Sequence, residues 1–157
     1  QAFLESFRRH GAGIAVVTLL KKDGSPTGFI ATSLASLSAN PPVATFNMTQ
    51  TASSWSSVAL DTPVLIHLLS TDNLELAYTM AGVSDQRFDG NHWETGPGGL
   101  PLLTDVHAWM SATVVAITEV EFSAMVAARV TGGALGDSAQ PLVYSEREYR
   151  AVASIND

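Results

Sequence analysis

Runs of apolar residues separated by short polar turns predict strands in the first half of the chain. IAVVTLL at 14–20 and PVLIHLL at 63–69 are rich in the aliphatic and β-branched residues that sheets favour. KKDGSPTG at 21–28 is built around Asp-Gly, which is typical of a hairpin turn, and a second strand returns from it until the prolines of 40–42. VATFNM at 43–48 predicts a third strand.

Helical spacing is confined to three short stretches. Apolar side chains predict a helix over 2–10, and TASSWSSVAL at 51–60, which starts with hydroxyl residues, predicts a second. A third helix is expected after a cap among residues 70–72, and it ends at Gly82. Its predicted apolar face carries Leu74, Ala77, Tyr78 and Ala81.

The second half of the chain predicts a loop over 83–105, two long strands at 108–120 and 122–131, and a short final strand at 142–144. Seven or so short strands with few helices favour a mainly β (α+β) fold, closed as a barrel, over a βαβ sheet. No repeat or linker interrupts the pattern, so residues 1–157 are expected to form a single domain.

Charge and cysteine content narrow the class of protein. The formal net charge of −7 disfavours binding to nucleic acid or to an anionic membrane. Because the chain has no cysteine, it contains no disulfide, thiolate nucleophile or iron–sulfur cluster. It also has no apolar run long enough for a membrane helix. These features predict a cytoplasmic protein.

Several common catalytic and nucleotide-binding motifs are absent from the sequence. GxGxxG, GxxxxGK[ST] and GxSxG do not occur, so there is no Rossmann fingerprint, P-loop or nucleophile elbow. The histidines lie far apart and form no HxH or HxxxH pair, so no metal site is predicted. They are His10, His67, His92 and His107.

Small hydroxyl residues are concentrated at 32–38 and at 49–57. Amide and hydroxyl donors in such segments can bind an anion, and Arg87 could grip a phosphate through two parallel hydrogen bonds. The residues alone leave an alternative open, in which the hydroxyls cap turns and Arg87 pairs with Asp85 or Asp89.

Four segments, taken in order, carry a family resemblance over nearly the whole chain. GIAVVTLLKKDGSPTGFIATSLASLSANPPVATFNM resembles an opening glycine-led strand, a DG turn and the pattern G-x-x-x-[TS]-S-x-x-S-x-S-x-x-PP. DQRFDG, LPLLTDVHAWMSATVVAI and QPLVYSEREYR resemble the later segments of the same family. The family is the flavin reductase-like proteins, which are FMN-binding split barrels. The resemblance implies an antiparallel split β-barrel, a homodimer, and FMN or FAD near the subunit interface.

The resemblance also implies a cofactor site and a reaction. The implied cofactor-binding residues are Thr32, Ser33, Leu34, Ala35, Ser36, Asn47, Thr49, Thr51, Ser53, Ser54, Trp55, Arg87 and Phe88. Of these, 32–36 would line the flavin ring and ribityl chain, Asn47 and 49–54 would meet the ribityl and phosphate end, and Arg87 would lie on the phosphate side. The implied reaction is hydride transfer from NAD(P)H to flavin, so no catalytic side chain is expected. A separate monooxygenase is an implied partner.

Three aromatic residues are candidates for the rim of this site, with core packing as the alternative. They are Phe88, Trp93 and Tyr144.

Two positions depart from the family pattern. Many members carry Gly-Asp-His between the two long strands, with the histidine near the nicotinamide, where this chain has Glu121-Phe122-Ser123. A family serine on the phosphate side aligns with Ala52. The first departure leaves open a flavin-binding protein without nicotinamide activity. A third alternative, from another class, is a small barrel that binds heme or another cofactor.

Overall fold

The computed structural model describes residues 1–137 and 140–156. The elements, in chain order and with 3-10 turns written η, are α1 (Ala2–Arg9), β1 (Ala12–Gly13), β2 (Ala15–Leu20), β3 (Pro26–Ala31), β4 (Ala35–Ala39), β5 (Pro42–Thr49), η1 (Trp55–Ser57), β6 (Pro63–Leu68), η2 (Thr71–Asn73), α2 (Leu74–Ala81), η3 (Ser84–Gln86), β7 (Trp93–Thr95), η4 (Pro97–Gly99), β8 (Pro101–Leu103), β9 (Ala108–Val120), β10 (Ser123–Leu135), β11 (Val143–Ser145) and β12 (Glu148–Arg150).

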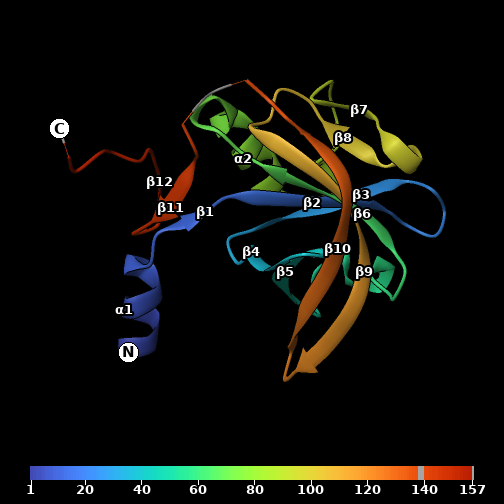
Figure 1. The fold of residues 1–157 in the computed structure, drawn as a ribbon, viewed down its shortest axis with the longest axis horizontal. Coiled ribbons are helices and arrows are strands. Elements are labelled where there is room, and N and C mark those ends of the chain that lie inside the picture. The colour runs from blue at the N-terminus through green and yellow to red at the C-terminus, as the bar shows by residue number, and fades with distance from the viewer. Residues whose placement is uncertain (138–139, 157) are drawn as a thin grey trace.

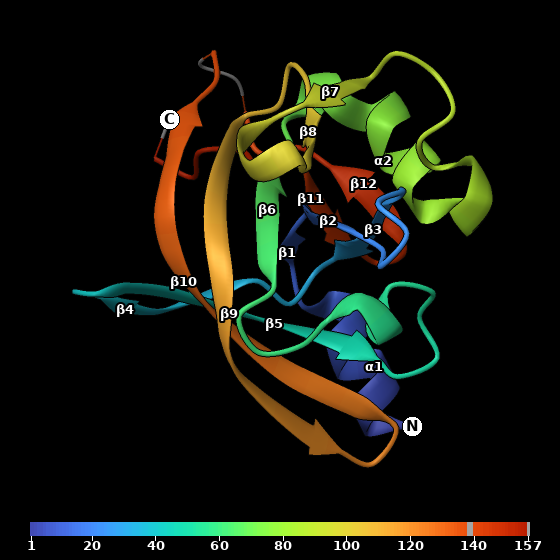
Figure 2. The same cartoon turned by 90° about the vertical axis from the view of Figure 1, so that its right-hand side faces the viewer.

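One seven-stranded sheet dominates the fold (Figure 1), with the strand order β3-β2-β6-β9-β10-β5-β4. Every neighbouring pair in it is antiparallel. The long, curved strands β9 and β10 run side by side down the molecule (Figure 2). The prediction of a mainly β, antiparallel fold with few helices is therefore confirmed.

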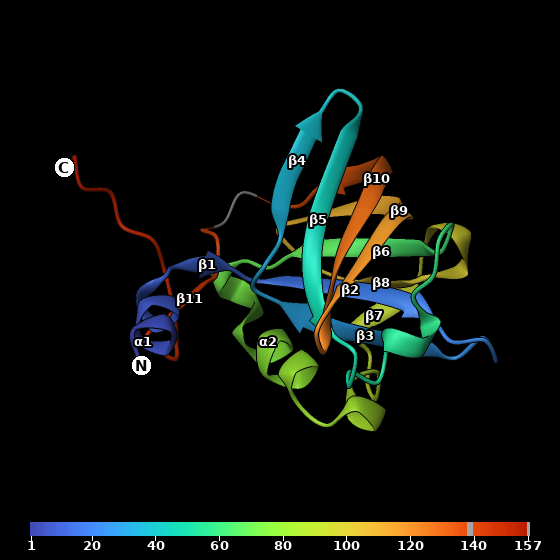
Figure 3. The same cartoon turned by 90° about the horizontal axis from the view of Figure 1, so that it is seen from below.

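In the part of the chain that the structure describes, the sheet does not close. The closed barrel favoured by the strand pattern is therefore wrong, and the split barrel implied by the resemblance is confirmed only in part. In the described residues, the edge strands β3 and β4 share no ladder. The chain leaves β3 after Ala31 and turns away, so that β4 and β5 form a hairpin that projects from the body (Figure 3). The open side is joined through side chains instead, because the rings of Phe29 and Phe46 pack 5.7 Å apart.

The Asp-Gly hairpin forms as predicted, over a shorter loop. β2 and β3 are paired from Ala15↔Ala31 to Leu20↔Pro26. Gly24 has φ 85°, the left-handed conformation that glycine adopts at low cost. The turn is closed by the Lys21 amide, which donates to the Ser25 carbonyl at 2.9 Å.

The helices agree with the sequence only in part. α1 is confirmed, yet none of its eight described residues is buried, and Phe3 and Phe7 are 70% and 60% exposed. The predicted helix 51–60 is wrong, because only η1, a three-residue turn, forms there. The buried Ser54 hydroxyl shares a 2.8 Å hydrogen bond with Thr27, which ties this segment to β3 rather than to a helix of its own.

α2 begins after a Ser70 capping box, as predicted, but it buries a different face. Leu76, Ala77 and Met80 are buried, whereas Tyr78 is exposed. The main core lies on the sheet around Phe29 and Phe46. The buried side of α2 belongs to a second apolar cluster, which includes Leu69 beneath the helix. Of the predicted face, only Ala77 lies inside.

The segment 83–105 is more ordered than the predicted loop. β7 and β8 form a two-stranded ribbon within it. At the C-terminal end, β11 pairs with both β1 and β12, which gives a small third sheet and extends the predicted strand 142–144. Within the described residues, no helix has the length and apolar character that crossing a bilayer requires.

Candidate functional site

The open side of the sheet, between the ends of β3 and β5, contains a pocket of about 360 Å³. Its lining residues are Phe29, Ile30, Ala31, Thr32, Ser33, Asn47, Met48, Thr49, Ala52 and Ser123. Phe29 and Met48 belong to the buried core and provide an apolar base. Thr32, Thr49 and Ser123 are exposed and provide a hydroxyl-bearing rim. We call this site the hydroxyl pocket; none of the ten described residues that line it is ionisable.

Side-chain hydrogen bonds fix one wall of the hydroxyl pocket. The backbone N–H of Asn47 donates to Ser33 Oγ at 2.8 Å, which links the segment after β3 to β5. Within residues 1–137 and 140–156, no intramolecular partner is found for the Thr32 hydroxyl or for the Asn47 side-chain amide. Both groups lie at the rim, so they are available to bond to a ligand.

The rest of the predicted ring-binding segment faces a neighbouring groove of about 440 Å³. Leu34, Ala35 and Ser36 line it together with Met110, Val130 and residues of the β4–β5 hairpin. The structure therefore divides the predicted segment 32–36 between two hollows that meet at residues 33 and 34.

The segment after β5 presents backbone donors. Thr51 Oγ1 bonds to Thr49 Oγ1 at 3.3 Å, and the Ala52 amide donates to the Thr49 carbonyl. In the described part of the chain, the amide N–H groups of Thr51 and Ser53 have no acceptor, and both residues are exposed, whereas Ser54 is fully buried. Free N–H groups on nearby turn residues can form an anion-binding concavity. The Ser54 hydroxyl is buried against Thr27 and Trp55 packs on the core, so their side chains serve the fold.

Arg87 is held by backbone carbonyls. Its Nη1 donates to the Gly28 carbonyl at 2.8 Å and its Nε to the Gly82 carbonyl at 3.1 Å. Partial burial lowers the pKa of the guanidinium from its ordinary value, which leaves it charged. Among the described residues, neither Asp85 nor Asp89 forms the ion pair that the sequence left open. Arg87 does not line the hydroxyl pocket, but Gly28 places it beside the strand that does.

The three aromatic rim candidates pack in the second apolar cluster instead. Phe88 and Trp93 are in edge contact at 5.5 Å, and the Trp93 indole N–H donates to the Phe88 carbonyl at 2.9 Å. Tyr144 packs on the same cluster. These three residues therefore pack against the core, which is the alternative that the sequence left open.

Gly28 is the position where this packing leaves no room. A Cβ there would lie 2.8 Å from the Val17 carbonyl oxygen and 3.2 Å from the Phe88 ring. We expect Gly28→Ala to lower the free energy of unfolding by about 1–3 kcal/mol because backbone must shift. Gly13→Ala is the control, since a Cβ there meets nothing within 4 Å. Equal denaturation midpoints for the two variants would show that the contact is relieved without cost.

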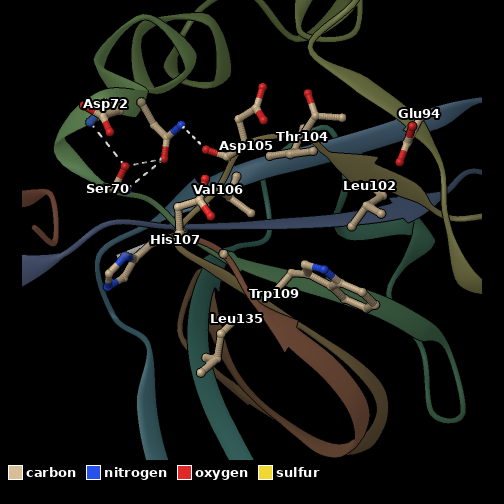
Figure 4. A pocket seen from close by; sticks show the side chains of 14 residues that line it. Ser70, Asp72, Glu94, Leu102, Thr104, Asp105, Val106, His107, Trp109 and Leu135 are labelled. Carbon is tan, nitrogen blue, oxygen red and sulfur yellow. Dashed lines mark hydrogen bonds between the residues drawn. The ribbon is translucent and has the colours of Figure 1, made fainter. Parts of the chain in front are cut away.

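A second pocket, of about 530 Å³, lies where α2 begins and β8 leads into β9 (Figure 4). It was not predicted from the sequence. Carboxylates dominate its polar lining: Asp72, Glu94, Asp105 and Asp137. They would repel a phosphate-bearing ligand, whereas the hydroxyl pocket would not. Within the described residues, no group of three metal-ligating side chains is present.

Known proteins resemble this chain over nearly its whole length. The sequence model of the family described as flavin reductase like domain matches residues 7–153. This chain belongs to the flavin reductase-like family. An NADH:FMN oxidoreductase of Rhodococcus erythropolis is 36% identical over 149 residues, which cover 92% of this chain and 77% of that protein.

Solved structures of flavin reductases have the same fold as this chain. A flavin reductase domain protein of Arthrobacter sp. FB24 is 41% identical, with a TM-score of 0.94 over 99% of this chain and 97% of its own. The flavin reductase HpaC, solved with NADP+, is 26% identical with a TM-score of 0.86 over 98% of each chain.

The family resemblance did not predict every residue of the hydroxyl pocket. Ser123 lies seventy-odd residues from Thr49 in sequence, and only the β5–β10 register sets the two opposite each other. Phe29 and Met48 read as ordinary core residues. The alternation of buried and exposed residues along β5 was the one local signal, because it leaves Asn47 and Thr49 exposed on either side of the buried Met48.

Proposed function

We propose that this chain is an NAD(P)H:flavin oxidoreductase that binds FMN in the hydroxyl pocket and reduces it with a nicotinamide cosubstrate. The observation that carries the proposal is an uncharged, hydroxyl-rimmed pocket on the backbone of a flavin reductase that is 41% identical. Relatives named NADH:FMN oxidoreductase support FMN and NADH as the pair to test first.

The residues present fit a flavin. Phe29 and Met48 offer an apolar base for a planar ring, and the Thr32 hydroxyl and Asn47 amide are free to bond to the polar edges of the ring. The unpaired amides of the exposed residues Thr51 and Ser53, in the described part of the chain, suit the phosphate.

The chain itself contributes binding, orientation and exclusion of water. When bound, the flavin supplies the hydride-accepting chemistry. None of the described lining residues is ionisable, so no side chain of the pocket is placed to hold or move a proton. The Ser33–Asn47 hydrogen bond fixes the polar wall before a ligand arrives, which lowers the cost of ordering it on binding.

Arg87 is proposed to act on the phosphate side through the guanidinium N–H groups that Gly28 and Gly82 do not occupy. We expect Arg87→Ala to raise the Kd for FMN by about 10-fold and the Kd for riboflavin by much less, because riboflavin has no phosphate. Flavin fluorescence quenching measures both. An equal loss for the two ligands would make Arg87 a structural residue that merely joins β3 to the end of α2.

The proposed activity is tested by mixing FMN-loaded protein with NADH and, separately, with NADPH in the absence of oxygen. Loss of the oxidised flavin absorbance with either nicotinamide is the expected result, and a parallel titration with FAD compares the two flavins. Tight FMN binding without bleaching would instead favour the second candidate, a flavin-binding protein without nicotinamide activity. The Glu121-Phe122-Ser123 turn motivates that candidate.

Two partners are proposed. The reductase component of a flavin-dependent trigonelline monooxygenase of Acinetobacter baylyi is 30% identical over 73% of this chain and 37% of that protein, which supports a separate monooxygenase as partner. Exposed Phe3 and Phe7 on α1 support a homodimer, because an eight-residue helix with an uncovered apolar face is marginal in water. Light scattering after gel filtration tests the dimer, and a monomer at micromolar concentration would remove it.

A further inference from the structure

A single residue, Gln50, holds all three carbonyls at the tip of the β9–β10 hairpin. Its backbone N–H donates to the Phe122 carbonyl at 2.9 Å. Its side-chain Nε2 donates to the Glu121 carbonyl at 3.3 Å and to the Ser123 carbonyl at 3.0 Å. Gln50 directly follows the last residue of β5, so these bonds tie the end of β5 to the tip of the hairpin. We call them the Gln50 clamp.

The turn at this tip has little other support. Val120 pairs with Ser123, so Glu121 and Phe122 form a two-residue turn. Glu121 has φ 54°, in the left-handed region that glycine favours and that a residue with a Cβ adopts at a cost. Phe122 is 81% exposed, so its packing contributes little to holding the turn in place.

The clamp bears directly on the hydroxyl pocket. Ser123, whose carbonyl accepts from Gln50, lines that pocket and pairs with Thr49, which lines it too. On the other side of Gln50, Thr51 belongs to the segment whose amides are free in the described structure. Loss of the Gln50 side chain would therefore free the turn carbonyls at Ser123, one wall of the pocket, where the ladder between β5 and β10 ends.

We propose that Gln50 is a positioning residue that fixes the Ser123 wall of the hydroxyl pocket for flavin binding. The inference rests on the proposed function for the identity of the ligand, FMN. It does not depend on reduction of that ligand. Gln50 acts through Ser123, so its side chain need not touch the cofactor.

The first test measures FMN binding by fluorescence quenching. Gln50→Leu removes the side-chain donors and is expected to raise the Kd for FMN by about 5–10-fold. Gln50→Glu, whose carboxylate cannot donate at neutral pH, should give the same loss. Thr118→Ala is the control, because this exposed β9 residue is paired with Met125 on the same hairpin and does not line the pocket. Its Kd should stay within about 2-fold of the wild-type value.

The second test asks whether the loss arises through the turn. Glycine at 121 suits the left-handed conformation, so Glu121→Gly should hold the turn without the clamp. The double variant Gln50→Leu/Glu121→Gly should therefore regain FMN binding to within about 2-fold of the Glu121→Gly single variant. A merely destabilising effect of Gln50→Leu would lower the thermal midpoint without this selective rescue.

The outcomes separate the clamp from the proposed function. Unchanged FMN binding in Gln50→Leu, or a loss that Glu121→Gly does not rescue, overturns the clamp even if the wild type oxidises NADH. Wild-type protein that binds FMN but does not oxidise nicotinamide overturns the proposed activity, while the binding measurements still decide on the clamp. Wild-type protein that binds no FMN overturns both.

Discussion

Ser123→Trp is expected to raise the Kd for FMN by at least about 100-fold. Ser123 is exposed, at the first position of β10, and lines the hydroxyl pocket opposite Thr49. An indole at this position would occupy the space between the ends of β3 and β5 without displacing a core residue. Because the fold should persist, the loss of binding would report on the pocket and not on unfolding.

Thr118→Trp is the matched control for this variant. Thr118 is exposed on β9 and does not belong to the described lining of the pocket, so the same indole there should leave FMN binding within about 3-fold. Circular dichroism should be unchanged for both variants. If Ser123→Trp binds FMN as the wild type does, flavin does not occupy the hydroxyl pocket.

His67 is expected to make the protein markedly less stable at acidic pH. Its ring is fully buried between two backbone groups, with Nδ1 3.0 Å from the Val16 carbonyl and Nε2 accepting from the Leu103 amide at 3.0 Å. This pattern requires the neutral ring, because a proton on Nε2 would oppose the Leu103 N–H. Burial lowers the pKa of His67 from its ordinary 6.5 to about 4, although the Val16 bond partly offsets the effect.

The direction of the pH effect follows from this shift. A base whose pKa is lower in the folded state favours folding while it is neutral in both states, above pH 6.5. As the pH falls from 6.5 toward 4, the unfolded chain binds the proton first, and stability is lost. We expect His67 alone to remove roughly 2 kcal/mol of unfolding free energy between neutral pH and a pH near 4.5.

His67→Gln isolates this contribution, because a glutamine amide offers a donor and an acceptor but does not titrate. Urea denaturation of wild type and variant across the same pH range gives the difference. The gap between the two free energies of unfolding should change in favour of the variant as the pH falls. A constant gap would mean that the acid sensitivity comes from other groups.

The sequence predicts those parts of the fold that local chemistry determines. Asp23 and Gly24 specify the β2–β3 turn, and Ser70 caps η2, the 3-10 turn that leads into α2. The predicted helix at 51–60 fails because the Ser54 hydroxyl is drawn to Thr27, a contact 27 residues away. The face of α2 fails for a similar reason, since the cluster beneath it selects Leu76 and Met80 rather than Leu74 and Tyr78.

In the candidate site, too, some residues could be predicted from the sequence and others depend on contacts between distant strands. Thr32, Ser33, Asn47 and Thr49 were named from the family pattern and do converge on one pocket. Leu34 to Ser36 face the adjacent groove, because the chain leaves β3 after Ala31 and pairs with β5 as β4 from Ala35 onward. Neither Ser123 nor the carbonyl partners of Arg87 could be read locally, since each depends on strands far apart in the sequence meeting at the open side of the sheet.

A crystal structure of the FMN complex tests the central claim most directly. We predict the flavin ring in the hydroxyl pocket, within hydrogen-bond distance of the Thr32 hydroxyl or the Asn47 side chain, and its phosphate at the amides of Thr51 and Ser53. Flavin seated instead in the pocket lined by Asp72, Asp105 and His107 would contradict it.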